Sequence, residues 1–434
     1  MGICTVYMTE GFNTRSLHAG AEPDSATGAR APPIYQTTSY VFDDADDAAD
    51  LYALREEGDV YSRVSNPTVR QLEARLASLE GGVDAVATAA GMAALDTATT
   101  ILAQSGDNIV ASSDMYGGTG TYLSKLAPRR GIETRTVETL EYDAYAEAID
   151  DDTAYVHVET LSNPSLLTPD FERLADVAHD HAVPLVVDNT FGTPYLCRPL
   201  EHGADIVWES TTKWIHGSGT TVGGILVDGG TFPWDHPDAN YPELSGENPA
   251  WGFDFSERFG ERAFTLAARH RAIRALGNQQ GPFDAWQTMQ GLETLPLRMD
   301  RHCENARAVA EFLRDDPRVD WVTYPGFDDH PTHDNATEYL DGYGGMVTFG
   351  VEGGFEPAKT FCESVELTSF LANIGDAKTL VIHPASTTHA QLSADEQRAA
   401  GVAPDMLRMS VGIENSEDII ADLDSGLEAA ANQQ

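Results

Sequence analysis

The sequence predicts an α/β fold built on a mostly parallel sheet that helices cover on both sides. Short runs of consecutive apolar residues alternate with segments whose apolar residues recur at helical spacing. Consecutive apolar residues are typical of strands buried on both faces, and their alternation with helices favours parallel pairing. In such a sheet, ligands bind at the carboxyl ends of the strands. The strands expected on this basis are 107–112, 154–160, 184–190, 204–210 and 221–228.

Composition divides the chain of 434 residues into three expected parts. Residues 1–70 are rich in Gly, Pro, Asp and Ala, and they predict an N-terminal arm that reaches a neighbouring subunit. Residues 71–280 hold the strands and predict the α/β domain. A helix that begins at Pro67 leads into that domain. Residues 281–434 mix strands with helices and predict a smaller α+β C-terminal domain.

Three further segments have patterns of their own. Residues 229–262 are rich in aromatic residues, Gly and Pro. Loops of this length are usually functional or disordered, and the aromatic residues favour an ordered loop near a site. Residues 263–314 predict a helical stretch. Near the end of the chain, Leu407 and Met409 alternate with Arg408, which predicts a strand with the arginine on the opposite face.

The chain is strongly acidic. It has 27 Lys and Arg against 69 Asp and Glu, which gives a formal net charge of −42. This charge argues against nucleic acid and an anionic membrane surface as partners, because both would be repelled. Halophilic proteins use such acidity to stay soluble in salt, so we expect a salt-rich cytoplasm. No apolar run approaches the ~18 residues that span a bilayer, and no secretory signal is visible. We therefore expect a cytoplasmic protein.

The cysteine and histidine patterns do not predict a metal site. The four cysteines lie far apart and form no CxxC pair, which disfavours a structural zinc site and a disulfide framework. The segment 328–334 (DDHPTHD) contains residue types that bind metals. In so acidic a chain, a polar loop is the better interpretation of that segment.

A lysine and an aspartate follow neighbouring strands of the expected sheet. Asp188 ends the run PLVVD, and Lys213 follows the run ADIVWES, so both open on the same sheet edge. The hydroxyls of Ser210 and Thr212 flank Lys213, which is one of only four lysines in the chain. An imine-forming lysine, an anion for a ring nitrogen and a phosphate cradle are what pyridoxal phosphate needs. The alternative is a loop lysine with an aspartate in an Asx turn.

Two other segments are candidates for binding a phosphate. Gly91 and Met92 open a helix, and backbone N–H groups at a helix N-terminus bind anions. Tyr61 and Arg63 in the arm offer a phenol and a bidentate guanidinium. An ordinary glycine before a helix and a surface arginine are the alternatives.

Tyr116 and Arg408 are candidates for contacting other parts of a ligand. Tyr116 follows the 107–112 strand at the same sheet edge, where its ring could stack on a planar cofactor. Arg408 is a candidate clamp for a substrate carboxylate. The alternatives are a core tyrosine and a surface ion pair.

The chain resembles the cystathionine γ-synthase/lyase family of pyridoxal-phosphate enzymes, the Cys/Met metabolism group. The resemblance lies in YSRVSNPT, ETLSNP, VVDNTFGTPYLCRPLEHGADIVWESTTKWIHGSGTTVGG and LRMSVGIE. The segments 371–392, 229–262 and QGLETLPLRMDRHCENA are similar to its O-acetylhomoserine sulfhydrylase branch. The resemblance covers nearly the whole chain after Gly11. It implies the aspartate-aminotransferase-like fold, fold type I, and bound pyridoxal 5'-phosphate.

This resemblance implies a role for each matched position. Lys213 would be the Schiff-base lysine and proton carrier, and Asp188 would pair with the pyridine nitrogen. Tyr116 would stack on the ring. Asn163 would hydrogen-bond the phenolic oxygen, and Arg408 would hold the substrate carboxylate.

The phosphate would have two sets of implied partners. Tyr61 and Arg63 would reach the phosphate of the neighbouring subunit, so the site needs at least a dimer, and a homotetramer built as a dimer of dimers is expected. The other partners are amides and hydroxyls near the chain's own site: Gly91, Met92, Ser210 and Thr212.

Departures from the family pattern narrow the implied reaction. Asn373 stands where synthases and lyases often have serine, in keeping with the sulfhydrylase branch, and it would lie at the substrate site. Gly118 replaces the cysteine typical of methionine γ-lyases, and Ala90 stands where many relatives have serine. The implied reaction is γ-replacement on O-acetyl-L-homoserine by sulfide, giving L-homocysteine and acetate in methionine biosynthesis.

Several alternatives to this reaction stay open. Within the family they are cystathionine γ-synthase, cystathionine γ-lyase and O-succinylhomoserine sulfhydrylase. Outside it they are a nicotinamide-dependent oxidoreductase, for which no strand–GxGxxG–helix is visible, and a non-catalytic binding protein.

Overall fold

The computed structural model describes residues 9–248, 251–390, 393, 397 and 401–433. Its larger sheet has seven strands in the order β1-β7-β6-β5-β4-β2-β3. Strands β3, β2, β4, β5 and β6 pair in parallel, and β7 pairs antiparallel with both β6 and β1. The mostly parallel sheet is thus confirmed. The bounds are β1 Asp84–Thr88, β2 Asn108–Ser112, β3 Glu133–Val137, β4 Thr153–Glu159, β5 Leu185–Asp188, β6 Ile206–Glu209 and β7 Gly224–Asp228.

Helices cover both faces of this sheet, as the buried strands require. On one face, Leu72, Tyr145 and Leu174 of three helices pack on Val187 and other strand residues. The helices of that face are α3 (Pro67–Glu80), α6 (Tyr142–Ala148) and α7 (Phe171–His179). The opposite face is covered by α4 (Gly91–Leu102), α10 (Ala263–Ala267) and the π-helix η5 (Ala268–Ile273).

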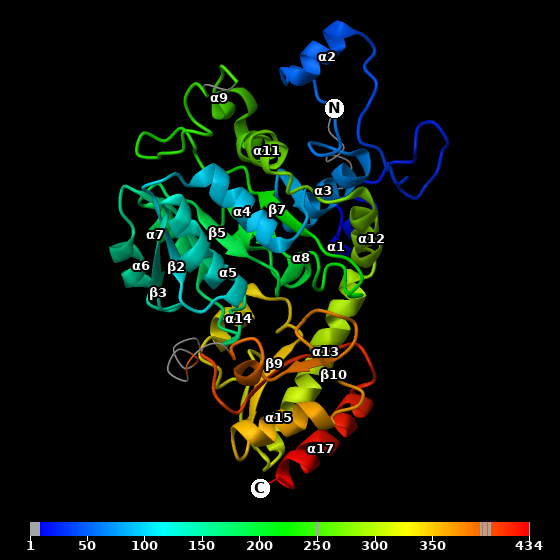
Figure 1. The fold of residues 1–434 in the computed structure, drawn as a ribbon, viewed down its shortest axis with the longest axis vertical. Coiled ribbons are helices and arrows are strands. Elements are labelled where there is room, and N and C mark those ends of the chain that lie inside the picture. Colours follow the sequence, from blue (N-terminus) through cyan, green and yellow to red (C-terminus); the bar gives the residue numbers. More distant parts are fainter. Residues whose placement is uncertain (1–8, 249–250, 391–392, 394–396, 398–400, 434) are drawn as a thin grey trace.

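The second sheet has five strands in the order β10-β11-β12-β9-β8 and lies below the first in Figure 1. Its pairing is antiparallel except between β10 and β11. Three helices bury their apolar sides against it. The elements are β8 Val319–Thr323, β9 Met346–Val351, β10 Ser369–Phe370, β11 Leu380–Ile382 and β12 Met406–Ser410, with α13 Leu295–Asp315, α15 Phe355–Ser364 and α17 Ser416–Ala431.

Shorter elements connect these layers. The α-helices are α1 Phe12–His18, α2 Ala45–Tyr52, α5 Gly117–Thr121, α8 Thr193–Leu196, α9 Phe255–Phe259, α11 Arg274–Leu276, α12 Pro282–Leu292 and α14 His333–Tyr339. The others are η1 Tyr122–Leu126, η2 Ala127–Arg130, η3 Pro199–His202, η4 Gly260–Arg262 and η6 Pro384–Ser386.

Two segments between residues 229 and 314 differ in detail from the sequence prediction. The stretch 263–314 is not continuously helical, because Gly277 adopts a φ of +82° and the chain runs irregularly up to Pro282. The 229–262 loop is ordered where it is described. Most of its aromatic rings pack in the core and none lines the larger of two cavities, but Trp251 lines the smaller one. Trp234, for example, stacks on Phe264 with ring centroids 5.7 Å apart. Burial of these rings against α10 explains why the loop is aromatic.

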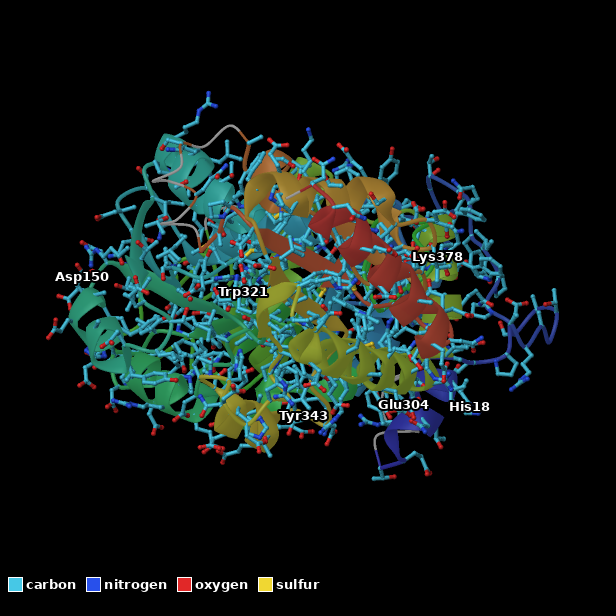
Figure 2. The ribbon with its side chains drawn as sticks, turned by 90° about the horizontal axis from the view of Figure 1, so that it is seen from below. His18, Asp150, Glu304, Trp321, Tyr343 and Lys378 are labelled. Carbon is cyan, nitrogen blue, oxygen red and sulfur yellow. The ribbon has the colours of Figure 1, made fainter. Side chains whose placement is uncertain are left out.

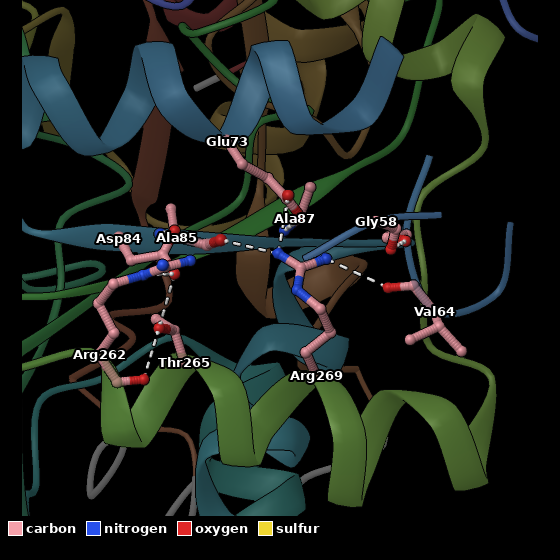
Figure 3. A network of polar contacts seen from close by, with 10 residues as sticks. Gly58, Val64, Glu73, Asp84, Ala85, Ala87, Arg262, Thr265 and Arg269 are labelled. Carbon is pink, nitrogen blue, oxygen red and sulfur yellow. Dashed lines mark hydrogen bonds and ion pairs between the residues drawn. The ribbon is translucent and has the colours of Figure 1, made fainter. Parts of the chain in front are cut away.

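A polar network ties the N-terminal arm to the large sheet (Figure 3). Arg269 donates to Glu73 Oε2 at 2.8 Å and to the carbonyls of Ala85 and Val64, both at 3.2 Å. Glu73 in turn accepts the Ala87 N–H at 2.8 Å. Because Val64 follows Arg63 directly, the network fixes the part of the arm that carries the predicted phosphate ligands.

Acidic side chains lie around the periphery of the molecule. Asp150 and Glu304, both exposed, mark opposite parts of the view in Figure 2. Exposed carboxylates repel one another, and salt screens that repulsion over about 10 Å at 0.1 M ionic strength.

Candidate functional site

A cavity of about 1420 Å³ lies between the carboxyl-terminal edge of the large sheet and the small sheet. Residues of both sheets line it, so the site depends on how the two sheets pack together. Of the twelve predicted site residues, all except Tyr61 and Arg63 line this cavity. They are Gly91, Met92, Tyr116, Asn163, Asp188, Ser210, Thr212, Lys213, Asn373 and Arg408.

Lys213 differs from the other three lysines, which are all exposed. It lies in the turn between β6 and β7, where its N–H donates to the Ser210 carbonyl at 3.1 Å. Its Nζ donates to Asn373 Oδ1 at 2.6 Å. Burial, and then the charge of Arg408, lower the pKa of Lys213 to about 8. A large fraction of the amine is therefore neutral at slightly alkaline pH, as a nucleophile or base must be.

Asp188 ends β5 and is paired in register with Glu159 at the end of β4. Asp188 accepts the Thr190 N–H at 2.9 Å, and burial raises the pKa of its carboxyl to about 7. Burial, and then the charge of Asp188, also raise the pKa of Glu159. Two buried carboxyls side by side cannot easily ionise together unless a cation lies near them. They therefore favour a cationic group in the cavity.

Sequence reasoning did not assign a role to Glu159. Its carboxylate accepts the N–H of Tyr116 at 2.6 Å and the N–H of Asn163 at 3.1 Å. It thus holds two predicted ligand-contacting residues in place. The sequence contains a signal that predicts a role for Glu159. It is an acidic residue at the end of the apolar run AYVHVE, and its strand is the neighbour of the strand that ends at Asp188.

The N-terminus of α4 forms a cradle beside Ser210. No side chain from the described part of the chain caps this helix at Ala90, and the Gly91 and Met92 amides precede the first intrahelical donors. A Cβ on Gly91 would lie 2.8 Å from Ser210 Cβ, so only glycine allows this close approach. Thr212 is less free than predicted, because its hydroxyl donates to the Gly223 carbonyl at 3.1 Å.

Arg408 projects from β12 into the cavity and has no carboxylate partner among the described residues. Its Nη1 donates to Asn163 Oδ1 at 3.1 Å, whereas its buried Nε has no partner there. A buried guanidinium with an open donor is suited to an anion such as a carboxylate. The predicted roles of Asn163 and Arg408 thus fall on residues that contact each other.

Tyr116 stands at the entrance to α5, with 47% of its surface exposed. Its ring lies so close to Gly118 that a Cβ there would come within 2.3 Å of the ring. The glycine that departs from the family pattern therefore makes room for this ring orientation.

Tyr61 and Arg63 lie elsewhere, in a second cavity of about 350 Å³. The Arg63 guanidinium lies 5.3 Å from the centre of the Tyr61 ring and donates to the Arg274 carbonyl. Trp251 of the 229–262 loop lines the same cavity. Neither arm residue lines the Lys213 cavity of its own chain, and their role at the phosphate of a neighbouring subunit stays a prediction.

These groups fit pyridoxal phosphate. The amine of Lys213, the buried carboxyl of Asp188 and the glycine-lined helix N-terminus at Gly91 open on one cavity. They match the aldehyde, the ring nitrogen and the phosphate of that cofactor. The fold and site together define a lysine-dependent pyridoxal-phosphate enzyme.

The described residues offer neither a metal-binding cluster nor a helix able to cross a membrane. No group of three or more His, Cys, Asp or Glu there is arranged to hold a metal ion, and Cys197, Cys303 and Cys362 are free thiols. Within the same residues, no helix combines the length and the apolar character that crossing a bilayer requires.

Comparison with known proteins identifies the family. The family model for Cys/Met metabolism PLP-dependent enzymes matches residues 13–428, so the chain belongs to that family. It is 49% identical over 425 residues to homocysteine synthase of Schizosaccharomyces pombe, covering 97% of this chain and 99% of the relative. It is also 49% identical over 420 residues to O-acetyl-L-homoserine sulfhydrylase 1 of Thermus thermophilus, covering 96% and 99%.

Solved structures confirm the fold. The metY protein of Campylobacter jejuni, which contains N'-pyridoxyl-lysine-5'-monophosphate, superposes with a TM-score of 0.93 at 36% identity, covering 96% of this chain and 100% of that one. The metB protein of Corynebacterium glutamicum gives a TM-score of 0.83 at 36% identity, covering 98% and 99%. Fold type I and pyridoxal phosphate, both predicted from the resemblance, are thereby confirmed.

Proposed function

We propose that this chain replaces the acetoxy group of O-acetyl-L-homoserine with sulfide, giving L-homocysteine and acetate. The observation that carries the proposal is the hydrogen bond from Lys213 to Asn373, which joins the one lysine that is not exposed to the residue expected to mark the sulfhydrylase branch. Relatives named for this activity are 47–49% identical to the chain over nearly its full length. In the net reaction the Cγ–O bond breaks with its electron pair on acetate, and a sulfur lone pair forms the new C–S bond.

Pyridoxal phosphate, when bound, supplies an electron sink conjugated to the substrate Cα. Arg408 would bind the substrate carboxylate through its open donor. Lys213 Nζ, with its lowered pKa, would accept the Cα proton and return it in a later step. Asp188 would hold a proton on the ring nitrogen, and Glu159 is its register partner at the end of the neighbouring strand.

We infer the assembly of subunits from the two predicted phosphate ligands in the N-terminal arm. Tyr61 and Arg63 would complete the phosphate site of a neighbouring subunit, so the active unit would be at least a dimer, and we propose a dimer of dimers. Support comes from their place in a second cavity, apart from Lys213. We also propose the division into arm (1–70), cofactor domain (71–280) and C-terminal domain (281–434). The seven-stranded sheet falls within the second part and the five-stranded sheet within the third.

A salt-rich cytoplasm is the setting we propose for this enzyme. The support is the net charge of −42, together with exposed carboxylates such as Asp150 and Glu304.

A product assay in concentrated salt tests the proposed reaction. The purified enzyme would receive O-acetyl-L-homoserine with sulfide, and homocysteine and acetate would be measured together. Parallel reactions with cysteine in place of sulfide, and with O-succinyl-L-homoserine in place of the acetyl ester, distinguish cystathionine γ-synthase and the succinyl-dependent branch. Faster turnover with cysteine would contradict the proposed reaction in favour of cystathionine γ-synthase, and faster turnover with O-succinyl-L-homoserine would favour the succinyl-dependent branch. Cleavage of cystathionine would instead favour cystathionine γ-lyase.

A further inference from the structure

The segment QGLETLPLRMDRHCENA, residues 290–306, has no part in the function described so far. It includes the start of α13, the long helix that runs from the large sheet into the small one (Figure 1). Three polar residues of α13, Arg298, His302 and Asn305, are buried. Their spacings of four and three residues place them on one face of the helix.

Arg298 holds the turn that carries Lys213. Its Nη1 donates to the Trp214 carbonyl at 2.6 Å, and its Nη2 donates to the Ile215 carbonyl at 3.0 Å. Nη2 also donates to the Gly291 carbonyl at 2.9 Å, and Nε donates to Thr294 Oγ1 at 3.2 Å. The guanidinium has no carboxylate partner in the described structure. It is therefore used as a rigid fork for carbonyl groups.

His302 and Asn305 hold the chain that leaves β12. His302 Nδ1 lies 2.6 Å from the Val411 carbonyl oxygen. Asn305 Nδ2 donates to the Gly412 carbonyl at 2.9 Å and to the Glu414 carbonyl at 2.8 Å. Val411 comes three residues after Arg408, so this end of the helix face fixes the strand of the carboxylate clamp.

The two held segments also contact each other through the loop that carries Asn373. The Ala377 N–H donates to the Gly217 carbonyl at 2.8 Å, and the Gly375 N–H donates to Ser410 Oγ at 2.9 Å. A Cβ on Gly375 would lie 2.6 Å from the backbone nitrogen of Trp214, so the loop packs closely against the segment that carries Lys213. One face of α13 thus contacts both the segment that carries Lys213 and the segment that follows Arg408. The loop that carries Asn373 lies between these two segments.

We propose that Arg298 and Asn305 are positioning residues, Arg298 for the Lys213 amine and Asn305 for the Arg408 clamp. This inference rests on the proposed function only where its test measures kcat and KM. The helix face sets how the amine and the carboxylate site stand relative to each other across two sheets. Misplacement of a reacting group by about 1 Å can cost roughly 100-fold in rate. Loss of these positioning contacts can therefore lower the reaction rate strongly.

Arg298→Lys is the first test, because lysine keeps the charge but cannot fork to several carbonyls. Holoenzyme is stripped of cofactor, exposed to pyridoxal phosphate over a range of pH and trapped with borohydride. The adduct on Lys213 is then quantified by peptide mass spectrometry. We expect the midpoint of trapping to move to higher pH, because a looser turn exposes the amine to water. We also expect kcat to fall about 10- to 100-fold while KM for the amino-acid substrate changes less than about threefold.

Asn305→Ala gives the contrasting result. We expect trapping at Lys213 to match the wild type, while KM for the amino-acid substrate rises about tenfold or more and kcat changes less. Arg301→Lys is the matched control, since Arg301 lies on the same helix but is exposed and paired with Glu304 at 3.1 Å. The control should leave trapping and kinetics unchanged.

A milder variant keeps the test decisive if Arg298→Lys does not fold. Thr294→Val removes only the hydroxyl that accepts from Arg298 Nε, and it should shift trapping in the same direction by a smaller amount. Equal losses of thermal stability in the Arg298 and Asn305 variants, with wild-type trapping and an unchanged split between kcat and KM, would overturn the proposal. Trapping needs no substrate, so failure of the proposed reaction would appear separately, as a missing homocysteine product.

Discussion

Replacing Gly91 with alanine tests the phosphate cradle most directly. The added Cβ would lie 2.8 Å from Ser210 Cβ, 3.0 Å from its Cα and 3.2 Å from its nitrogen, whereas ordinary contact begins at 3.4 Å. Ser210 cannot move aside easily, because its N–H donates to Thr190 Oγ1 at 2.9 Å. On the other side, the Gly224 backbone packs so closely that a Cβ there would lie 2.4 Å from the Ala90 carbonyl oxygen. The first turn of α4 is therefore clamped between β6 and β7.

Overpacking of this kind costs about 1–3 kcal/mol. The protein without cofactor can relieve the strain by tilting the first turn of α4, but bound phosphate needs the Gly91 and Met92 amides to converge. We therefore expect the strain to weaken pyridoxal-phosphate affinity by roughly 5- to 150-fold, at 1.4 kcal/mol for each factor of ten. The dissociation constant would be measured by titrating stripped enzyme with the cofactor and following its absorbance.

Gly11→Ala is the matched control, because no heavy atom lies within 4 Å of a Cβ at that position and its φ is −61°. It should bind the cofactor as the wild type does. Wild-type affinity in Gly91→Ala, within a factor of two, would refute the assignment of the cradle to this helix N-terminus.

Three other perturbations address the amine, its charged neighbour and the acidic surface. Lys213→Ala should abolish both turnover and the borohydride-trapped adduct, while Lys359→Ala, at an exposed lysine, should preserve both; an adduct of normal yield in Lys213→Ala would contradict the assignment. Arg408→Gln removes the charge that, after burial, lowers the pKa of Lys213, so the pH midpoint of trapping should rise from about 8 towards the ~10.4 of free lysine, with a higher KM for the amino acid. A midpoint that moves to lower pH would show that the sign of this interaction is wrong. The thermal midpoint of unfolding should rise as salt is added, because screening relieves repulsion among 69 acidic residues, and full stability in dilute buffer would contradict a halophilic protein.

The central strands were predictable because they are buried on both faces. The runs at 184–190 and 204–210 are apolar on consecutive residues, and the observed strands β5 and β6 fall within them. Two strands of the large sheet were missed. β3 lies at the sheet edge, where Glu133 is exposed and the apolar signal fades, and β1 is a short alanine-rich segment that resembles the start of a helix.

The part of the site that could be predicted is the part that lies at the carboxyl-terminal edge of the large sheet. Asp188 and Lys213 each follow a strand, so topology alone brings them together. The approach of Asn373 to Lys213 was not visible in the spacing of residues, because 160 positions separate them and the contact depends on the packing of the small sheet. The same is true of Arg298, because three of its four acceptors are main-chain carbonyls, which any residue supplies.

Burial of the site cations has a second consequence in a chain this acidic. Surface arginines such as Arg135 and Arg173 pair with Asp150 and Asp143, at 2.7 and 2.8 Å. Across the described residues, neither Lys213 nor Arg408 forms an ion pair with a carboxylate. If the Arg408 guanidinium were exposed, the surplus of acidic side chains would compete with an anionic ligand for it. Burial lowers the pKa of Lys213 and also keeps the Arg408 guanidinium away from surface carboxylates. Added salt screens exposed pairs far more than buried ones, so we expect Arg408 to keep its attraction for an anion at salt concentrations that weaken the surface pairs.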